Sequence, residues 1–230
     1  MDVIIEKFNS TFIVADRYKL FVEGFQNTVI IAIGAAIIGI IIGALVAMVR
    51  VYRAQTGRLK WLDRLLGAYV AVFRGTPVIV QLMIMYFIVL VSIDNALIIA
   101  VIAMGINSGA YVSEHFRAGI MSIDVGQTEA GRSLGLPAFK VLLLVVMPQA
   151  VKNILPTLGN EFILLIKDTS VVGAYLPLRE LAKAGANVRA NTADPYFSLL
   201  FIALVYFLMV MGVTRLLQIL ERRLRRSDRG

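Results

Sequence analysis

The sequence predicts an all-α membrane protein with about five transmembrane helices, folded as a single domain over residues 1–230. Of its 230 residues, 59% are hydrophobic and only 17% are charged, and the mean hydropathy is +0.80. These values lie well outside the usual composition of a water-soluble domain. A spanning helix needs about 20 mostly apolar residues, so five spans with short connections fill this length. No room remains for a large soluble catalytic domain.

Five apolar runs give the expected spans, which we place at residues 25–49, 65–91, 96–120, 141–166 and 196–217. The first follows an acidic stretch with Asp2, Glu6 and Asp16, where a signal peptide would be basic, so we expect it to be retained. It carries small residues at every fourth position, which predicts a surface for close helix packing. They are Ala35, Gly39, Gly43 and Ala47. The second run is interrupted at Arg74–Pro77.

The distribution of basic residues predicts the orientation. Arginines and lysines follow the first span from Arg50 to Arg64, lie between the third and fourth spans, and follow the fifth from Arg222 onward. The positive-inside rule places these regions in the cytoplasm. The N-terminus is then outside and the C-terminus cytoplasmic. The net charge of +8 therefore indicates membrane orientation rather than nucleic-acid binding. Residues 167–194 would lie outside.

The fourth span carries a polar stripe, defined here as Gln149, Lys152, Asn153, Pro156, Thr157, Asn160 and Glu161. Its spacing follows the 3.6-residue period, and a face of this kind must look into protein or a water-filled cavity. In one interpretation Glu161 is neutralised by another helix or sits at the outer interface of the membrane. In the other, it faces the cationic part of a solute. Pro148 and Pro156 make this span a candidate broken helix.

Between the third and fourth spans, residues 122–137 predict a short cytoplasmic helix. Asp124 and Gln127 have the spacing of a capping box, Gly135 fits a left-handed helix end, and Pro137 suits the first turn of the next helix. By itself this segment is an ordinary connector.

Other polar residues carry weaker predictions. Gln81 and Asn107 either line the same cavity or cap a neighbouring helix. Glu114 and Arg117 have the spacing of a structural pair, and the lone His115 has no companion that predicts a metal or catalytic role. The sequence contains no cysteine and no Gly-x-x-x-x-Gly-Lys-Ser/Thr loop. We therefore expect no metal, no cofactor and no ATP site of that type in this chain.

The segment Glu129-Ala130-Gly131, with Gly135 and then Met147-Pro148, resembles the signature loop of ATP-binding-cassette importer permeases. Two positions depart mildly from the usual pattern, Gly131 for alanine and Met147 for leucine. Further segments are similar to the polar amino acid permease family (histidine, glutamine and arginine type) in the same order and spacing. They are Phe73–Pro77, Gln81-Leu82, Asn107–Tyr111, Gly126-Gln127, Pro148–Ala150, Leu158–Asn160 and Lys167–Ser170.

This resemblance implies a multi-pass subunit in the cell membrane of a prokaryote. The implied partners are a cytoplasmic ATP-binding subunit that uses ATP and Mg, an extracytoplasmic solute-binding protein, and a second permease subunit in a homodimer or heterodimer. The short helix would be the coupling helix that docks into the ATPase. The residues implied in coupling are Gln127, Thr128, Glu129, Ala130, Gly131 and Gly135. Because Tyr175–Leu181 departs from the family pattern, no role is transferred to it.

The resulting hypothesis is a non-enzymatic transport subunit that moves polar amino acids by alternating access, with Glu161 favouring arginine, lysine or histidine. Asn160, Thr157, Gln81 and Asn107 are the other expected substrate-binding residues. If Glu161 binds the α-ammonium instead, neutral or acidic substrates such as glutamine or glutamate are equally suitable. An autonomous channel or ion-coupled carrier, and a membrane scaffold, are the alternatives from other classes.

Overall fold

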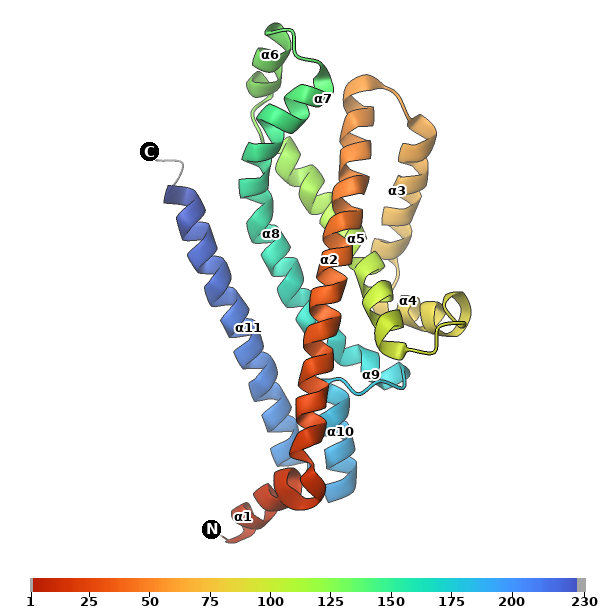
Figure 1. Ribbon diagram of the computed structural model, residues 1–230, viewed down its shortest axis with the longest axis vertical. Helices are drawn as coiled ribbons and strands as arrows, with labels where there is room; N and C mark the ends of the chain where they lie inside the picture. The colour runs from red at the N-terminus through yellow and green to blue at the C-terminus, as the bar shows by residue number, and fades with distance from the viewer. Residues whose placement is uncertain (1, 227–230) are drawn as a thin grey trace.

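The computed structural model describes residues 2–226, which contain helices and no strand (Figure 1). The longer helices are α2 (Tyr18–Thr56), α3 (Lys60–Gly75), α5 (Ala96–Met121), α8 (Met147–Asp168), α10 (Leu181–Thr192) and α11 (Pro195–Arg226). The shorter ones are α1 (Asp2–Phe8), α4 (Val78–Ile84), α6 (Val125–Ser133), α7 (Ala138–Val141) and α9 (Val172–Tyr175). Three π-helical turns, at Asn9–Ile13, Met85–Val89 and Leu142–Val146, and two 3₁₀ turns, at Val14–Asp16 and Thr169–Val171, connect them.

Four single helical runs among the described residues are long and apolar enough to span a membrane. The bent pair Lys60–Gly75 with Val78–Val89, in which the second helix turns by 112° from the first, makes the fifth expected span if it is counted as one. The bend falls within the predicted interruption. Thr76 adopts an extended conformation (φ −121°, ψ 148°) because the ring of Pro77 disfavours helical geometry in the preceding residue.

The small-residue face of α2 packs against α5, as predicted. A Cβ atom added to Gly39 would lie 2.9 Å from Ser108 Oγ, and one added to Gly43 would lie 2.5 Å from a methyl group of Val112. Ala35 and Ala47 on the same face are buried. Any larger side chain on this face would therefore push the two helices apart.

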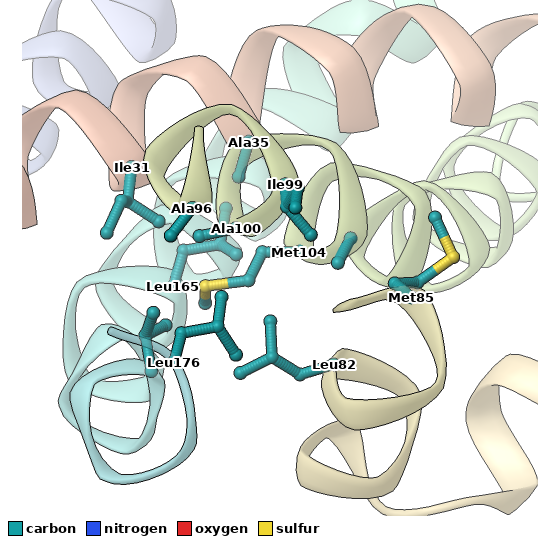
Figure 2. Packing of buried hydrophobic residues seen from close by; sticks show 12 residues of the cluster. Ile31, Ala35, Leu82, Met85, Ala96, Ile99, Ala100, Met104, Leu165 and Leu176 are labelled. Atoms are coloured by element: carbon teal, nitrogen blue, oxygen red, sulfur yellow. The ribbon is translucent and has the colours of Figure 1, made fainter. Parts of the chain in front are cut away.

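A hydrophobic cluster joins α2 and α5 to α4 and to the end of the fourth span (Figure 2). Figure 2 shows Met104 of α5, Leu82 of α4, Leu165 of α8 and Leu176 within this cluster, with Ile31 of α2 at its edge. Burial of large apolar side chains at this crossing fixes α4 and the end of α8 against the α2–α5 pair.

The fourth span is continuous rather than broken, which differs from the prediction. It runs as one helical segment from Ala138 to Tyr175. The π-helical turn at Leu142–Val146 comes directly before Pro148, where a widened turn accommodates the ring and the missing N–H. Pro156 lies inside α8 without ending it. Packing against neighbouring helices holds the helix together despite the lost hydrogen bond.

The segment at residues 167–194, for which the sequence predicts a location but no elements, is largely helical. It contains the end of α8, the turn Thr169–Val171, α9 and α10. Leu181, Ala184 and Val188 of α10 are fully buried against Phe21 of α2 and Ile202 of α11. This amphipathic helix therefore closes one end of the bundle.

The two ends of the molecule carry different elements (Figure 1). The helix α6, the turn between α2 and α3, and the C-terminal end of α11 lie at one end, whereas α1 and α10 lie at the other. The basic residues Arg50–Arg64 thus share an end with α6. This arrangement is the one expected if both lie on one side of a membrane. Arg229 of the basic tail lies outside the described residues.

Candidate functional site

Glu161 lies on α8 at the interface with α5 and is only 8% exposed. Its Oε1 atom accepts a 2.9 Å hydrogen bond from Ser108 Oγ, and its Oε2 atom lies 3.7 Å from Nε2 of His115. Ser108 and His115 are seven residues apart on α5, so both project from one face of that helix. Another helix therefore supplies the partners of this carboxylate, as one of the two interpretations of the sequence expected.

A cavity of about 260 Å³ adjoins this carboxylate. Ser108 and Glu161 are its polar lining residues, and the rest of the wall is apolar. The apolar wall includes Ile33, Ile37 and Ile40 of α2 and Leu158, Phe162 and Leu165 of α8. A carboxylate at the wall of an apolar cavity is poorly solvated and gains most from a ligand that brings positive charge.

Of the other residues in the polar stripe, some form hydrogen bonds within the protein and some are exposed. Thr157 Oγ1 donates to the carbonyl oxygen of Ile154 at 2.7 Å, and Asn153 Nδ2 donates to Ser122 Oγ at 2.9 Å. Asn160 is exposed. Asn160 and Glu161 are successive residues, about 100° apart around the helix, so they point to different surroundings.

Gln81 and Asn107 lie together, but they form a network of their own. Asn107 Nδ2 donates to Gln81 Oε1 at 2.7 Å, and Gln81 Nε2 donates to the carbonyl oxygens of Phe73 and Thr76 at 2.9 and 3.0 Å. These carbonyl groups lack helical partners because Pro77 ends α3. The two amides therefore hold the bend between α3 and α4. Among the described residues, no hydrogen bond joins either amide to Glu161.

The predicted short helix is α6. Its first turn is capped by Asp124, whose Oδ1 accepts from the N–H of Gly126 at 2.6 Å. The reciprocal half of the capping box is absent, because the Gln127 side chain instead accepts from Gln149 Nε2 at 3.2 Å. Gly135 has a φ of +81°, which confirms the left-handed end. Pro137 precedes α7 as its N-cap rather than entering the first turn.

The residues expected to couple to another subunit divide by exposure. Gln127, Glu129 and Ala130 are exposed, Thr128 is half-buried, and Gly131 is buried. A Cβ atom at Gly131 would lie 2.9 Å from a methyl group of Val141, so α6 sits directly against α7. Glu129 therefore projects from a helix whose inner side is fixed.

Glu180 is a buried carboxylate that the sequence did not indicate. It is 0% exposed, and it accepts hydrogen bonds from the N–H groups of Ala182 and Lys183 at 2.6 and 2.7 Å. The hydroxyl of Tyr206 donates a third at 3.1 Å. Burial raises the pKa of Glu180 above its ordinary range, against these hydrogen bonds. In the sequence, Glu180 follows Pro177 and directly precedes the amphipathic segment that forms α10, a position that could have indicated a helix cap.

Comparisons with known proteins agree with this architecture. Residues 39–226 match the family model described as "Binding-protein-dependent transport system inner membrane component". The putative glutamine transport system permease protein GlnP of Rickettsia bellii is 36% identical, over 90% of this chain and 94% of its own. The arginine transport system permease protein ArtQ of Bacillus subtilis is also 36% identical, over 92% and 95%. The glutamine permease GlnP of Escherichia coli is 31% identical, over 90% and 93%.

Solved structures show the same fold. A crystal structure of an amino acid ABC transporter with histidines superposes with a TM-score of 0.81 at 35% identity, covering 90% of this chain and 94% of that one. An inward-facing structure of the MetNI methionine ABC transporter gives 0.78 at 20% identity, covering 89% and 96%, and supports the fold alone. These matches confirm the resemblance to ABC importer permeases. The chain therefore belongs to the family of binding-protein-dependent transport system inner membrane components.

Proposed function

We propose that this permease subunit translocates polar amino acids, with arginine, lysine and histidine as preferred substrates, by alternating access. The observation that carries the proposal is the buried carboxylate of Glu161 beside an otherwise apolar cavity at membrane depth. The relatives named for arginine and glutamine transport support an amino acid as the solute. The family match supports an importer over an autonomous channel, carrier or scaffold.

The geometry at Glu161 suits a transient cationic ligand. Ser108 forms a hydrogen bond with one carboxylate oxygen, but the separation of 3.7 Å from His115 is longer than a hydrogen bond. The second oxygen therefore keeps acceptor capacity for an ammonium or guanidinium group. A charge-assisted bond of this kind is about twice as strong as a neutral one.

The other expected binding residues have different places in this proposal. Asn160 is exposed on the turn of α8 that carries Glu161, and Thr157 lies one turn earlier. Neither residue lines the cavity at Glu161, so they would offer neutral hydrogen bonds to the solute at another point of its path. Gln81 and Asn107 contribute indirectly to solute binding, by holding the bend between α3 and α4. This assignment replaces direct solute contact for the two amides.

A second candidate is the same importer type with glutamine as its substrate. The nearby imidazole of His115 can match the charge of Glu161 when it is protonated, which reduces the advantage of a cationic side chain. Glu161 would then bind the α-ammonium group that every amino acid carries. Several relatives are named for glutamine transport, which also favours this candidate.

The proposed complex contains a second permease subunit, a cytoplasmic ATP-binding subunit and an extracytoplasmic solute-binding protein in a prokaryotic cell membrane. The ATPase would dock at α6, and ATP and Mg would bind to that separate subunit. The chain itself is a transport subunit and not an enzyme. In this orientation α10 and α1 face the solute-binding protein.

The test is ATP turnover by the purified complex in lipid vesicles, with and without its binding protein, measured against arginine, lysine, histidine, glutamine and glutamate. Stimulation by the basic amino acids alone supports the proposal. Stimulation by glutamine or glutamate retains the importer and contradicts the basic preference. If the permease copurifies with no ATPase, the importer proposal itself fails.

A further inference from the structure

A second cavity, of about 490 Å³, lies at the end of the molecule that carries α6. Its charged lining residues are Arg50 and Arg53 of α2, Asp63 of α3 and Arg117 of α5. Most of the remaining wall is apolar and includes Val51, Ile120, Ile123, Val125 and Val146. The cavity therefore combines clustered arginines with a hydrophobic wall.

The positive charge in this cavity exceeds the negative charge that faces it. Arg50 Nη1 donates to Glu114 Oε1 at 2.6 Å, and Arg117 donates to the other oxygen of Glu114 at 2.7 and 3.0 Å. Asp63 lies 3.6 Å from Arg50 Nε and 3.4 Å from Arg53 Nε. Three guanidinium groups thus share two carboxylates.

Arg53 is the cation that retains capacity to bind an anion. Its side chain is half-exposed, and its ion pair with Asp63 is loose. Arg50 adds positive charge beside it, although its Nε atom is itself buried. An oxygen-rich anion in the cavity would give Arg53 the close partner that Asp63 supplies only at a distance.

The position of the cavity selects the kind of anion. The apolar run of α2 ends at Val49, directly before Arg50, and Arg117 lies in the last turns of α5. The cavity therefore lies at the boundary between the hydrocarbon core and water. Phosphate groups of lipids occupy this level, and the apolar wall can receive the first carbons of their acyl chains.

We propose that this cavity binds the phosphate headgroup of an anionic phospholipid. Arg53 binds the phosphate oxygens, the charge of Arg50 adds to the attraction, and the apolar side chains contact the glycerol and upper acyl carbons. Val125 and Thr128 of α6 also line the cavity. The bound headgroup would therefore touch the helix assigned above to the ATPase contact.

The test is native mass spectrometry of the purified importer complex titrated with phosphatidylglycerol or with phosphatidylcholine. Wild type should retain phosphatidylglycerol in preference, and Arg53→Gln should weaken that retention by about fivefold, as expected for one cation at a membrane surface. Arg58→Gln is the matched control. It removes the same charge from the nearby turn, but Arg58 does not line the cavity.

Equal retention of phosphatidylglycerol by the two variants would overturn the proposal, as would equal binding of the two lipids by wild type. A third titration uses inorganic phosphate alone. If millimolar phosphate displaces the Arg53-dependent lipid, the cavity takes a soluble anion, and the lipid assignment is wrong. Melting temperatures of both variants should match wild type, because neither arginine forms a short hydrogen bond through its side chain in the described structure.

Discussion

Glu161 of α8 and His115 of α5 face each other across a helix interface, with 3.7 Å between Oε2 and Nε2. The separation is too long for a hydrogen bond, so the two groups attract each other chiefly when the imidazole is protonated. Ser108 donates the hydrogen bond that fixes the other carboxylate oxygen. One carboxylate oxygen is therefore fixed by Ser108, and the other remains within reach of a cationic ligand.

Replacing Gly39 with alanine should disturb the site through Ser108. The added Cβ atom would lie 2.9 Å from Ser108 Oγ and 3.0 Å from its Cβ atom. Overpacking of this kind costs about 1–3 kcal/mol. We expect a lower melting temperature and slower arginine uptake. Gly67→Ala in α3 is the control, because a Cβ atom there meets nothing within 4 Å. If both variants behave alike, the packing explanation is incorrect.

Replacing Glu129 with lysine should uncouple the transporter without unfolding it. Glu129 is exposed on α6, and its charge reversal leaves the packing of Gly131 against Val141 unchanged. We expect membrane yield and melting temperature to match wild type, whereas binding-protein-stimulated ATP turnover and uptake are lost. Normal uptake by this variant would rule out a coupling role for the Glu129 side chain.

Replacing Glu180 with alanine should destabilise the junction of α10 and α11. The change removes the N-cap of α10 and the partner of the Tyr206 hydroxyl, at a cost of about 1–3 kcal/mol. Thermal unfolding in detergent checks the loss. Glu23→Ala, at a half-exposed carboxylate paired with Arg179, is the control and should have a smaller effect.

The same carboxylate predicts a pH dependence of stability. Because burial raises the pKa of Glu180, the folded state holds its proton more tightly than the unfolded state. The contribution of Glu180 to stability is therefore greatest in acid. It declines as the pH rises from 4.5, the ordinary pKa of a glutamate, through the raised pKa of the folded state. The stability of wild type relative to Glu180→Gln should fall across this window. A constant difference would show that the folded and unfolded pKa values are equal.

Much of the fold could be predicted because the bilayer imposes length and polarity on each element. The five apolar runs, the interruption at Arg74–Pro77 and the small-residue face of α2 all correspond to local rules for spanning helices. The short helix at 125–133 and the positive φ of Gly135 also follow from neighbouring residues. These features depend on composition and spacing alone.

The remaining features depend on contacts between distant residues. Periodicity placed Glu161 on a polar face, but only the packing of α5 against α8 reveals Ser108 and His115 as its neighbours. Likewise, the sequence left open whether Gln81 and Asn107 line the cavity or cap a neighbouring helix. Only the fold of α4 back at Pro77 shows that both donate to the last carbonyl groups of α3. The π-helical turn before Pro148 accommodates the proline without a break, an outcome that the proline pattern alone did not predict.

The most direct test of the central claim compares arginine and glutamine uptake by the Glu161→Gln variant in reconstituted vesicles. If Glu161 recognises the cationic side chain, arginine uptake should fall about tenfold more than glutamine uptake, the ratio for a charged contact of roughly 1.4 kcal/mol. Asn160→Ala, on the adjacent position of α8, should lower both rates by similar factors. Equal losses for the two substrates in Glu161→Gln would contradict recognition of the side chain.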